Sequence, residues 1–168
     1  MIVGAAVFTI GAGLLYTLDV GSSTGAWVGY QFLAGFGSGA GIQVPFIVVQ
    51  VVLSAKDMPT GNAIAIFFNS LGGAISISIA QNIFSNGLQK HIPTYAPEVD
   101  VQAVVNAGAT FLRSAVSPTS LVGVIKAYML ALTDAFVIAI AFGGLATICA
   151  CFVEWKSVKG KKITAAAA

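Results

Sequence analysis

The chain has 168 residues, of which 57% are hydrophobic and only 8% are charged, and its mean hydropathy is +0.92. Soluble domains carry about 25% charged residues, so this chain has too few charges to cover a water-facing surface and is predicted to be an integral membrane protein. The net charge of +2 argues against nucleic-acid binding, and one His with two Cys argues against a disulfide scaffold or a Cys/His metal cluster.

Long stretches with almost no charged residues predict four membrane-spanning helices, over residues 1–17, 26–53, 61–86 and 127–153. A helix needs about 20 mostly apolar residues to cross the hydrocarbon core of a bilayer. Continuous apolar runs favour helices over barrel strands, which alternate over about 10 residues. The predicted fold class is therefore an all-α membrane protein with about four transmembrane helices.

The first run, residues 1–17, is short and begins at Met1. It lacks the basic region and the clear small-residue cleavage site of a secretory signal peptide. We therefore expect a transmembrane helix whose beginning is missing. A short polar loop, residues 19–25, leads from it to the second span.

The second span, residues 26–53, is rich in glycine and contains a proline. Small residues let helix backbones approach closely inside a bilayer, so Gly39 and Gly41 are predicted to be packing positions. Pro45 removes an intrahelical hydrogen bond and is predicted to kink or loosen the helix. In transporters, such breaks often lie near substrate sites.

Polar side chains recur every seven residues in the second and third spans, which places them on one face of each helix. In the second span they are Gln43 and Gln50, and in the third they are Asn62, Asn69 and Ser76. Polar groups are costly in lipid, so these residues either line a cavity or form hydrogen bonds between helices. The sequence leaves both alternatives open.

The segment between the third and fourth spans, residues 87–126, is predicted to be an extracytoplasmic loop. Within it, residues 101–116 form either a short interfacial helix or a solvated loop. His91 follows Lys90 in this loop and is expected at the surface. Asp134 is the one ionisable residue inside a predicted span, which makes it a candidate proton site. Its position close to the outer end of the span favours a structural role.

Four lysines crowd the tail after the last span, residues 154–168. The positive-inside rule places this basic tail in the cytoplasm. Counting back through the spans puts Lys56 on the cytoplasmic side and the 87–126 loop outside. The chain contains no Ser/His/Asp set, paired carboxylates, HExxH or CxxC motif, so we expect no enzyme activity, no cofactor and no metal site.

An ordered set of motifs runs through the chain from Gly39 to Lys159. The motifs are Gly39-Ala40-Gly41-Ile42-Gln43-Val44-Pro45, then Asp57, Pro59 and Gly61, then Leu71-Gly72-Gly73-Ala74, and finally Glu154-Trp155-Lys156-Ser157-Val158-Lys159. On these motifs the chain resembles the C-terminal half of fungal major facilitator transporters. It is similar in particular to the fourteen-helix drug:proton antiporter family, which includes multidrug and mycotoxin efflux pumps.

The resemblance implies a partial major facilitator fold, whose four spans are the last four of fourteen. It implies proton-coupled export of small amphiphilic compounds such as drugs, toxins or secondary metabolites. The implied partners are the substrate, protons, the lipid bilayer and a missing N-terminal transporter half that holds the family's proton-coupling acid. The implied location is the plasma membrane in preference to the vacuolar membrane. The expected cavity residues are Gln43, Gln50, Asn62, Phe68 and Asn69, and the expected packing and kink residues are Gly39, Gly41, Pro45, Gly72 and Gly73.

Four helices are too few for the two six-helix halves that enclose a substrate in major facilitators. We therefore expect the chain to be a C-terminal fragment of a transporter. The alternative is a self-contained four-helix membrane protein, either a small multidrug exporter or a non-transporting scaffold. Small exporters use a central carboxylate in an early span, and the first three predicted spans contain none.

Overall fold

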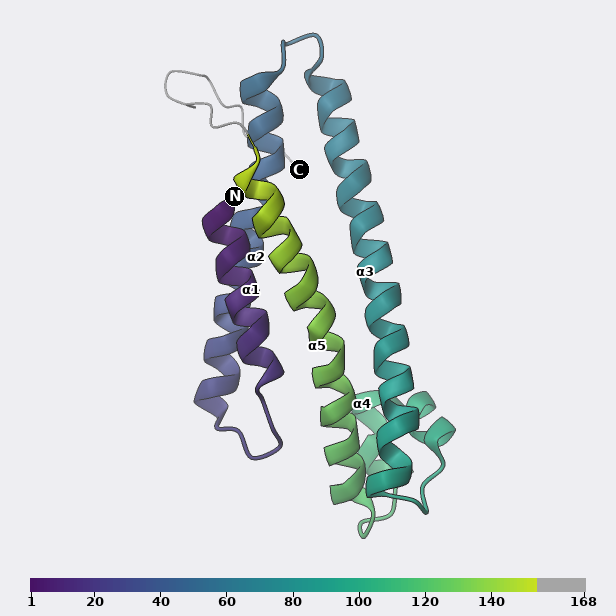
Figure 1. Ribbon diagram of the computed structural model, residues 1–168. Helices are drawn as coiled ribbons and strands as arrows, with labels where there is room; N and C mark the ends of the chain where they lie inside the picture. Colours follow the sequence, from purple (N-terminus) through teal and green to yellow (C-terminus); the bar gives the residue numbers. More distant parts are fainter. Residues whose placement is uncertain (154–168) are drawn as a thin grey trace.

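The computed structural model describes residues 1–153, apart from the side chains of residues 113–115. This part of the chain is all helical and contains no strand (Figure 1), which confirms the predicted all-α membrane fold class. The predicted basic tail lies outside the described residues. The helices are α1 (Ile2–Tyr16), α2 (Thr24–Val52), α3 (Met58–Tyr95), α4 (Val101–Ala115) and α5 (Leu121–Cys151).

Among residues 1–153, three helices are long and apolar enough to cross a membrane, namely α2, α3 and α5. The remaining predicted span, residues 1–17, corresponds to α1, an apolar helix of only 15 residues. At a rise of about 1.5 Å per residue, α1 covers about 22 Å of the roughly 30 Å hydrocarbon core. Whether α1 crosses the bilayer therefore stays a prediction, as do the limits of the other spans.

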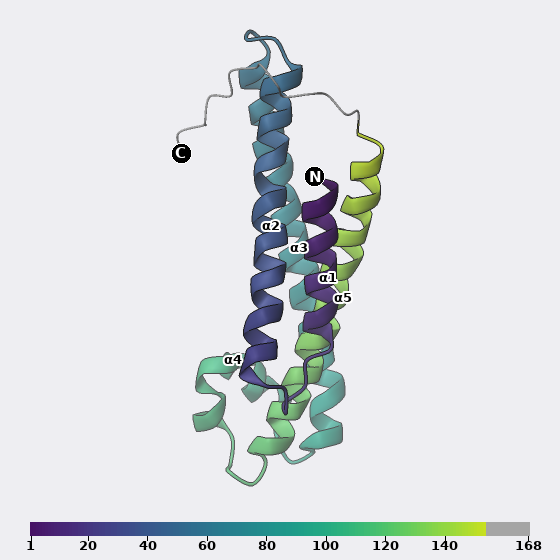
Figure 2. The ribbon, with the colours of Figure 1, turned by 90° about the vertical axis from the view of Figure 1, so that its left-hand side faces the viewer.

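The helices turn back on one another along a common direction (Figures 1 and 2). α1 and α2 form a hairpin, α5 packs against both α1 and α3, and α4 lies beside α3 at the end opposite the α2–α3 loop. The close contact between α2 and α3 is at that loop, where a Cβ on Gly61 would touch Leu53 and Val49. Beyond the loop the two helices diverge.

The segment predicted to be a loop, residues 87–126, is largely helical, which corrects that prediction. α3 continues to Tyr95, α5 already begins at Leu121, and α4 lies between them. Of the two alternatives for residues 101–116, the structure supports the helix, which is kinked at Gly108, where φ is 60°. Asp100 caps the start of α4, and its carboxylate accepts a hydrogen bond from the Gln102 backbone N–H at 3.1 Å, as is usual for a helix cap.

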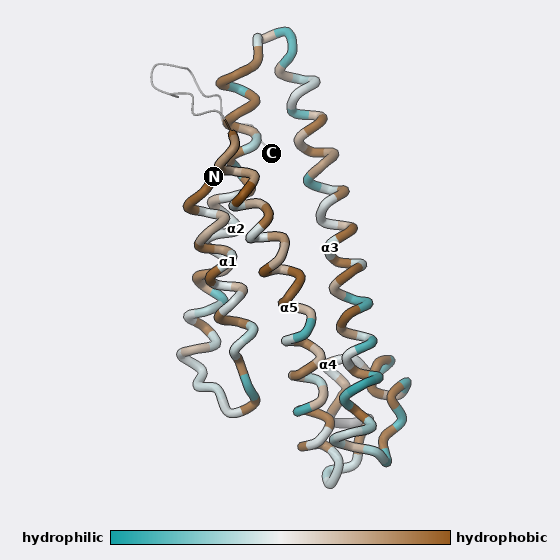
Figure 3. Tube along the Cα trace, in the orientation of Figure 1, coloured by the Kyte–Doolittle hydropathy of each residue, from teal (hydrophilic) through white to brown (hydrophobic). Residues whose placement is uncertain are grey.

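The physical reason for the longer helices is a small apolar core at the α4 end. Leu88 and Ile92 of α3, Val104 of α4, and Val124 and Ala127 of α5 are all fully buried there. Charged residues interrupt the hydropathy of this region, but apolar residues still recur at helical spacing and pack together. In Figure 3, hydrophilic positions alternate with hydrophobic ones in this part of the fold.

Glycines bring α1 close to both α2 and α5. A Cβ on Gly37 would collide with the backbone of Phe8, and a Cβ on Gly11 would lie 2.6 Å from the Ala34 nitrogen. Such distances are shorter than van der Waals contact, so only glycine permits this helix separation. Packing at small residues is therefore a property of this bundle.

The glycines predicted for packing occupy other places. A Cβ on Gly39, Gly41, Gly72 or Gly73 would meet no atom within 4 Å of the described chain. Gly39 follows Gly37 by two residues, about 200° around the helix, and so faces away from α1. Gly41 does adjoin α1, because a Cβ on Gly4 would lie 3.3 Å from its nitrogen. A packing role for these four glycines stays a prediction.

Candidate functional site

A cavity with a volume of about 680 Å³ lies among α1, α2, α3 and α5. We call it the central cavity. Volumes of about 300–1,000 Å³ are typical of small-molecule sites. Its wall is mainly apolar, and in the described part of the chain no ionisable side chain lines it. The lining residues are Met1, Ala5, Phe8, Gly37, Ser38, Gly41, Ile42, Pro45, Asn69, Ser76, Ile77, Ala80, Leu132, Ala135, Phe136, Ile138, Ala139, Phe142, Gly143, Ala146 and Ala150.

The polar groups of the central cavity are neutral. Asn69 and Ser76 come from α3 and Ser38 comes from α2. Pro45 has no backbone N–H, so the Gly41 carbonyl four residues earlier lacks its usual helical donor. Both residues line the cavity, although α2 runs through Pro45 as one continuous helix. The cavity thus combines apolar surface with a few hydrogen-bonding groups.

Of the predicted cavity residues, Asn69 is the one that lines the central cavity. Gln43 is exposed and Gln50 is half-buried, and neither belongs to its lining. Gln43 follows Ala34, which is buried in the core with Leu15 and Leu18 of the α1 end, by nine residues. Nine residues correspond to about 900°, or two and a half turns, which places Gln43 on the opposite face of α2.

The remaining two predicted residues also lie outside the central cavity. Phe68 is 64% exposed, and its ring packs edge-to-face on Phe67 with centroids 5.4 Å apart. Asn62 is half-buried near the α2–α3 loop, and within the described chain its Oδ1 atom is buried without a hydrogen-bond partner. Polarity identified these residues, whereas nine of the 21 residues of the cavity wall are apolar residues of α5, which carry no such signal.

A second cavity, of about 580 Å³, lies toward the α4 end. We call it the outer cavity. Leu132 and Phe136 of α5 line both cavities and therefore lie between them. The lining residues of the outer cavity are Leu15, Leu18, Asp19, Val20, Ser22, Thr24, Trp27, Gln31, Leu112, Ile125, Tyr128, Met129, Leu132 and Phe136.

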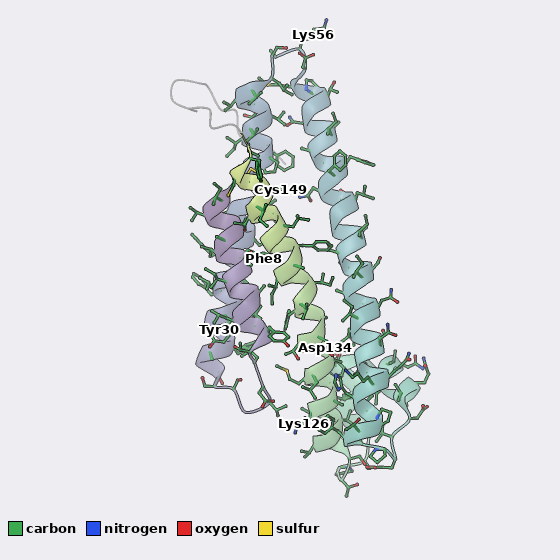
Figure 4. All side chains as sticks on the ribbon, in the orientation of Figure 1. Phe8, Tyr30, Lys56, Lys126, Asp134 and Cys149 are labelled. Atoms are coloured by element: carbon green, nitrogen blue, oxygen red, sulfur yellow. The ribbon has the colours of Figure 1, made fainter. Side chains whose placement is uncertain are left out.

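A hydrogen bond joins a side chain of α3 to a side chain of α5. His91 Nε2 lies 3.0 Å from Asp134 Oδ2, and the side chains are 17% and 45% exposed. Figure 4 shows Asp134 on α5, in the region where α5 faces α3. The prediction that His91 is a surface loop residue is wrong, because α3 continues through it to Tyr95. The helical spacing of His91 with buried Leu88 was the sequence signal for this position.

A hydrogen bond outside the long apolar stretches ties the α3–α4 loop to the start of α5. The Ser120 hydroxyl donates to Glu98 Oε1 at 2.5 Å. This bond holds the pKa of the Glu98 carboxyl below its usual range. Among the residues that the structure describes, no group of three His, Cys, Asp or Glu side chains comes together to hold a metal ion.

Comparison with known proteins finds fungal relatives along nearly the whole chain. An MFS-type transporter of Aspergillus oryzae is 44% identical over 163 residues, which is 97% of this chain and 29% of that protein. An efflux pump of Penicillium rubens is 44% identical over 164 residues, 98% of this chain and 30% of the pump. An MFS-type efflux pump of Trichophyton rubrum is 44% identical over 166 residues, 99% of this chain and 31% of the pump.

The chain thus spans about 30% of the length of the curated relatives that it matches. No family model matches the chain. No solved structure matches it either.

Proposed function

Because this chain belongs by homology with the fungal MFS-type transporters and efflux pumps, we propose that it forms part of a proton-coupled major facilitator transporter that exports small amphiphilic compounds. The relatives are transporters and pumps, which confirms the prediction that the chain is not an enzyme. Export, proton coupling and the substrate class are proposed for a complete transporter, of which the chain supplies a set of membrane helices.

The central cavity is the observation that carries the proposed substrate class. A charged compound entering it would lose its hydration without meeting an opposite charge, which is strongly unfavourable. A largely apolar compound with a few hydroxyl, carbonyl or amide groups would instead contact the α5 wall and bond to Ser38, Asn69 or Ser76. Neutral amphiphiles such as drugs, toxins and secondary metabolites have this chemistry.

A second surface supports a partner beyond this chain. Gln43 is exposed on α2, and the neighbouring Phe36 on the same face is 64% exposed. Amide groups directed at lipid would lose their hydrogen bonds, so this face needs protein or water against it. We assign it to the substrate path shared with the missing N-terminal transporter half. Gln43, Gln50 and Phe68 would then contact substrate there.

The proposed orientation follows from the helix directions. The last turns of α5 lie toward the end that holds the Lys56 loop, and α4 lies at the opposite end (Figures 1 and 4). The positive-inside rule then puts Lys56 and the C-terminus in the cytoplasm and α4 outside. An exporter of this kind acts on the cell's surroundings from the plasma membrane, which is the proposed location.

The test replaces the matching region of the Trichophyton rubrum efflux pump by this chain and measures compound export from pump-deficient yeast cells. The chimera should retain export. Asn69→Ala should lower export about 2- to 10-fold, as expected for one lost hydrogen bond of about 0.5–1.5 kcal/mol. Gln43→Ala should also lower it if the outward face of α2 meets substrate.

Gln81→Ala is the matched control, because Gln81 is an exposed amide on α3 that lines neither cavity. Surface amounts of all variants are measured in parallel. If Asn69→Ala and Gln43→Ala both export like the control, the site assignment is wrong. If the chimera reaches the membrane but exports nothing, the proposed function is wrong.

A further inference from the structure

We propose that the outer cavity binds organic cations that carry apolar groups, with the Asp19 carboxylate as their charged partner. The two cavities of the molecule differ in charge. Among the described residues, no charged side chain lines the central cavity, whereas Asp19 lines the outer one. This binding site goes beyond the proposed export of neutral compounds and does not depend on it.

One face of α2 and one face of α5 form the main walls of the outer cavity. On α2, the lining residues Thr24, Trp27 and Gln31 follow one another at intervals of three and four residues, so they lie on one side of the helix. The α5 wall has similar spacing from Ile125 to Phe136. Because α1 packs against both helices, a ligand in this cavity meets side chains from α2 and α5 at once.

The loop between α1 and α2, residues 17–23, brings a carboxylate to this cavity. The Asp19 backbone N–H donates to Ser22 Oγ at 2.9 Å, and Asp19 Oδ1 accepts from the Val20 N–H at 2.7 Å. These bonds fix the loop. Within the described part of the chain, Asp19 Oδ2 has no hydrogen-bond donor and no salt-bridge partner, so one carboxylate oxygen is available to a ligand.

No cationic side chain among the described residues lines the outer cavity. Lys126 follows a lining residue of α5 in the sequence, but its ammonium lies 4.8 Å from the centroid of the Tyr95 ring. The start of α2 offers little to an anion, because the Ser23 hydroxyl already accepts a hydrogen bond from the Ala26 N–H at 3.3 Å. The charge at the cavity is therefore the negative charge of Asp19.

Aromatic rings on both walls of the outer cavity also favour a cation. Trp27 of α2 and Tyr128 and Phe136 of α5 all line it. The face of an aromatic ring attracts positive charge, and indole attracts it most strongly. A bound cation would thus be stabilised by the Asp19 carboxylate and by the rings together, whereas an anion would be repelled by both.

The apolar part of the outer cavity limits the kind of cation that fits. Most of its lining is apolar, and its volume of about 580 Å³ is large enough for several aryl or alkyl groups. A small, strongly hydrated ammonium would lose its water there without enough acceptors to replace it. Quaternary ammonium and phosphonium ions surrounded by apolar groups lose less hydration and gain contact with the wall.

The experiment measures binding of radiolabelled tetraphenylphosphonium to the full chain in nanodiscs of zwitterionic lipid, by equilibrium dialysis against empty nanodiscs. Saturable binding is expected, and Asp19→Asn should weaken it about 3- to 10-fold through the loss of a partly solvated charged partner. Asn keeps an oxygen for the Val20 N–H, so the loop should keep its shape. Trp27→Leu should weaken binding about 2- to 5-fold through the loss of the indole face.

Two matched controls remove the same chemical groups from other places. Asp57→Asn removes an exposed carboxylate from the α2–α3 loop, and Tyr16→Leu removes a ring of α1 that is as exposed as Trp27; neither residue lines a cavity. Both variants should bind the probe like wild type. Triphenylphosphine oxide, a neutral compound with three of the same aryl groups, should compete only at a concentration about tenfold higher or more.

Equal affinities for wild type and Asp19→Asn, or no saturable binding above that of empty nanodiscs, would overturn the cation site. A greater loss of affinity in Asn69→Ala than in Asp19→Asn would also overturn it, because it would place the cation in the central cavity. If the chain alone yields no folded sample, the same pair of proteins is compared in the chimera. Binding that depends on Asp19 in a chimera that exports nothing overturns the proposed function alone, and the reverse result overturns the cation site alone.

Discussion

Helix α3 packs differently against its two long neighbours, α5 and α2. Against α5, α3 contributes fully buried Leu88 and Ile92, a glycine contact at Gly87 and the His91–Asp134 bond. Against α2, it has its close contact near the connecting loop, and no residue in its most hydrophobic stretch is buried. The α3–α5 contact is complete within the chain, whereas the α2–α3 side is open.

This difference assigns stability and function to two different sides of α3. Burial and close packing at the α4 end hold α3 in place, since van der Waals contact is the main attraction between helices in lipid. The open side presents amides and aromatic rings, and its residues Asn69 and Ser76 line the central cavity. Substitutions on the α5 side of α3 should therefore affect folding, and substitutions on the α2 side should affect export.

The largest expected effect is on stability and comes from the side of α3 that packs on α5, which we call the closed side. Leu88→Ala removes a fully buried side chain from the core at the α4 end and should destabilise the chain by about 2–5 kcal/mol, as for core leucines elsewhere. Ile77→Ala is the control on the same helix, because Ile77 is 71% exposed. Thermal unfolding in detergent measures both. Equal unfolding temperatures for the two variants would contradict the division of α3 into a closed and an open side.

A somewhat smaller effect is expected for the contact between α1 and α2. Gly37→Ala places a Cβ against the Phe8 backbone, and relieving that collision should cost about 1–3 kcal/mol. Gly39→Ala adds the same methyl group where no atom lies within 4 Å, so its effect should stay within about 0.5 kcal/mol. The same unfolding assay applies. A more damaging Gly39→Ala would show that this face is covered by protein.

The sequence predicted the helical class and the approximate places of the long helices, because lipid requires long apolar runs whatever the tertiary structure. It did not predict the ends of α3 and α5. Lys90 and His91 interrupt the hydropathy there, but tertiary burial of Leu88 and Ile92 keeps the helix intact.

The candidate site was predicted only in part, for a related reason. Heptad spacing predicts Asn69 and Ser76 on one face of α3, and both residues line the central cavity. The same rule grouped Gln43 with Gln50, but spacing along one helix does not tell which neighbour that face meets. Which face of α2 meets α1 depends on the packing of the two helices through Gly11 and Gly37, which is a tertiary property.

A third effect, of intermediate size, is expected on compound preference at Phe136, which lies between the two cavities. Phe136→Ala should join the central and outer cavities and allow longer compounds to bind, with a change in preference of about tenfold, comparable to that of one or two methylene groups in an apolar pocket. Val137→Ala alters the exposed neighbour, which lines neither cavity, and serves as the control. Export of a homologous series of alkyl amides by the chimera measures the preference. An unchanged series would show that the cavities do not lie on the export path.

The smallest expected effect concerns the Glu98–Ser120 bond, which closes the α4 end of the closed side. A carboxyl whose folded pKa is lowered stabilises the protein at pH values above its unfolded pKa and loses this contribution as the pH falls through the folded value. The Ser120 hydroxyl lowers the pKa of Glu98 from its ordinary value of 4.5. The gap in unfolding temperature between wild type and Glu98→Gln should therefore be present near neutral pH and shrink below 4.5. In a Ser120→Ala background, which lacks the donor, Glu98→Gln should no longer alter the pH profile. A gap that persists unchanged at low pH would mean that the neutral acid serves this contact as well as the carboxylate does, and that the α4 end is held by its apolar core alone.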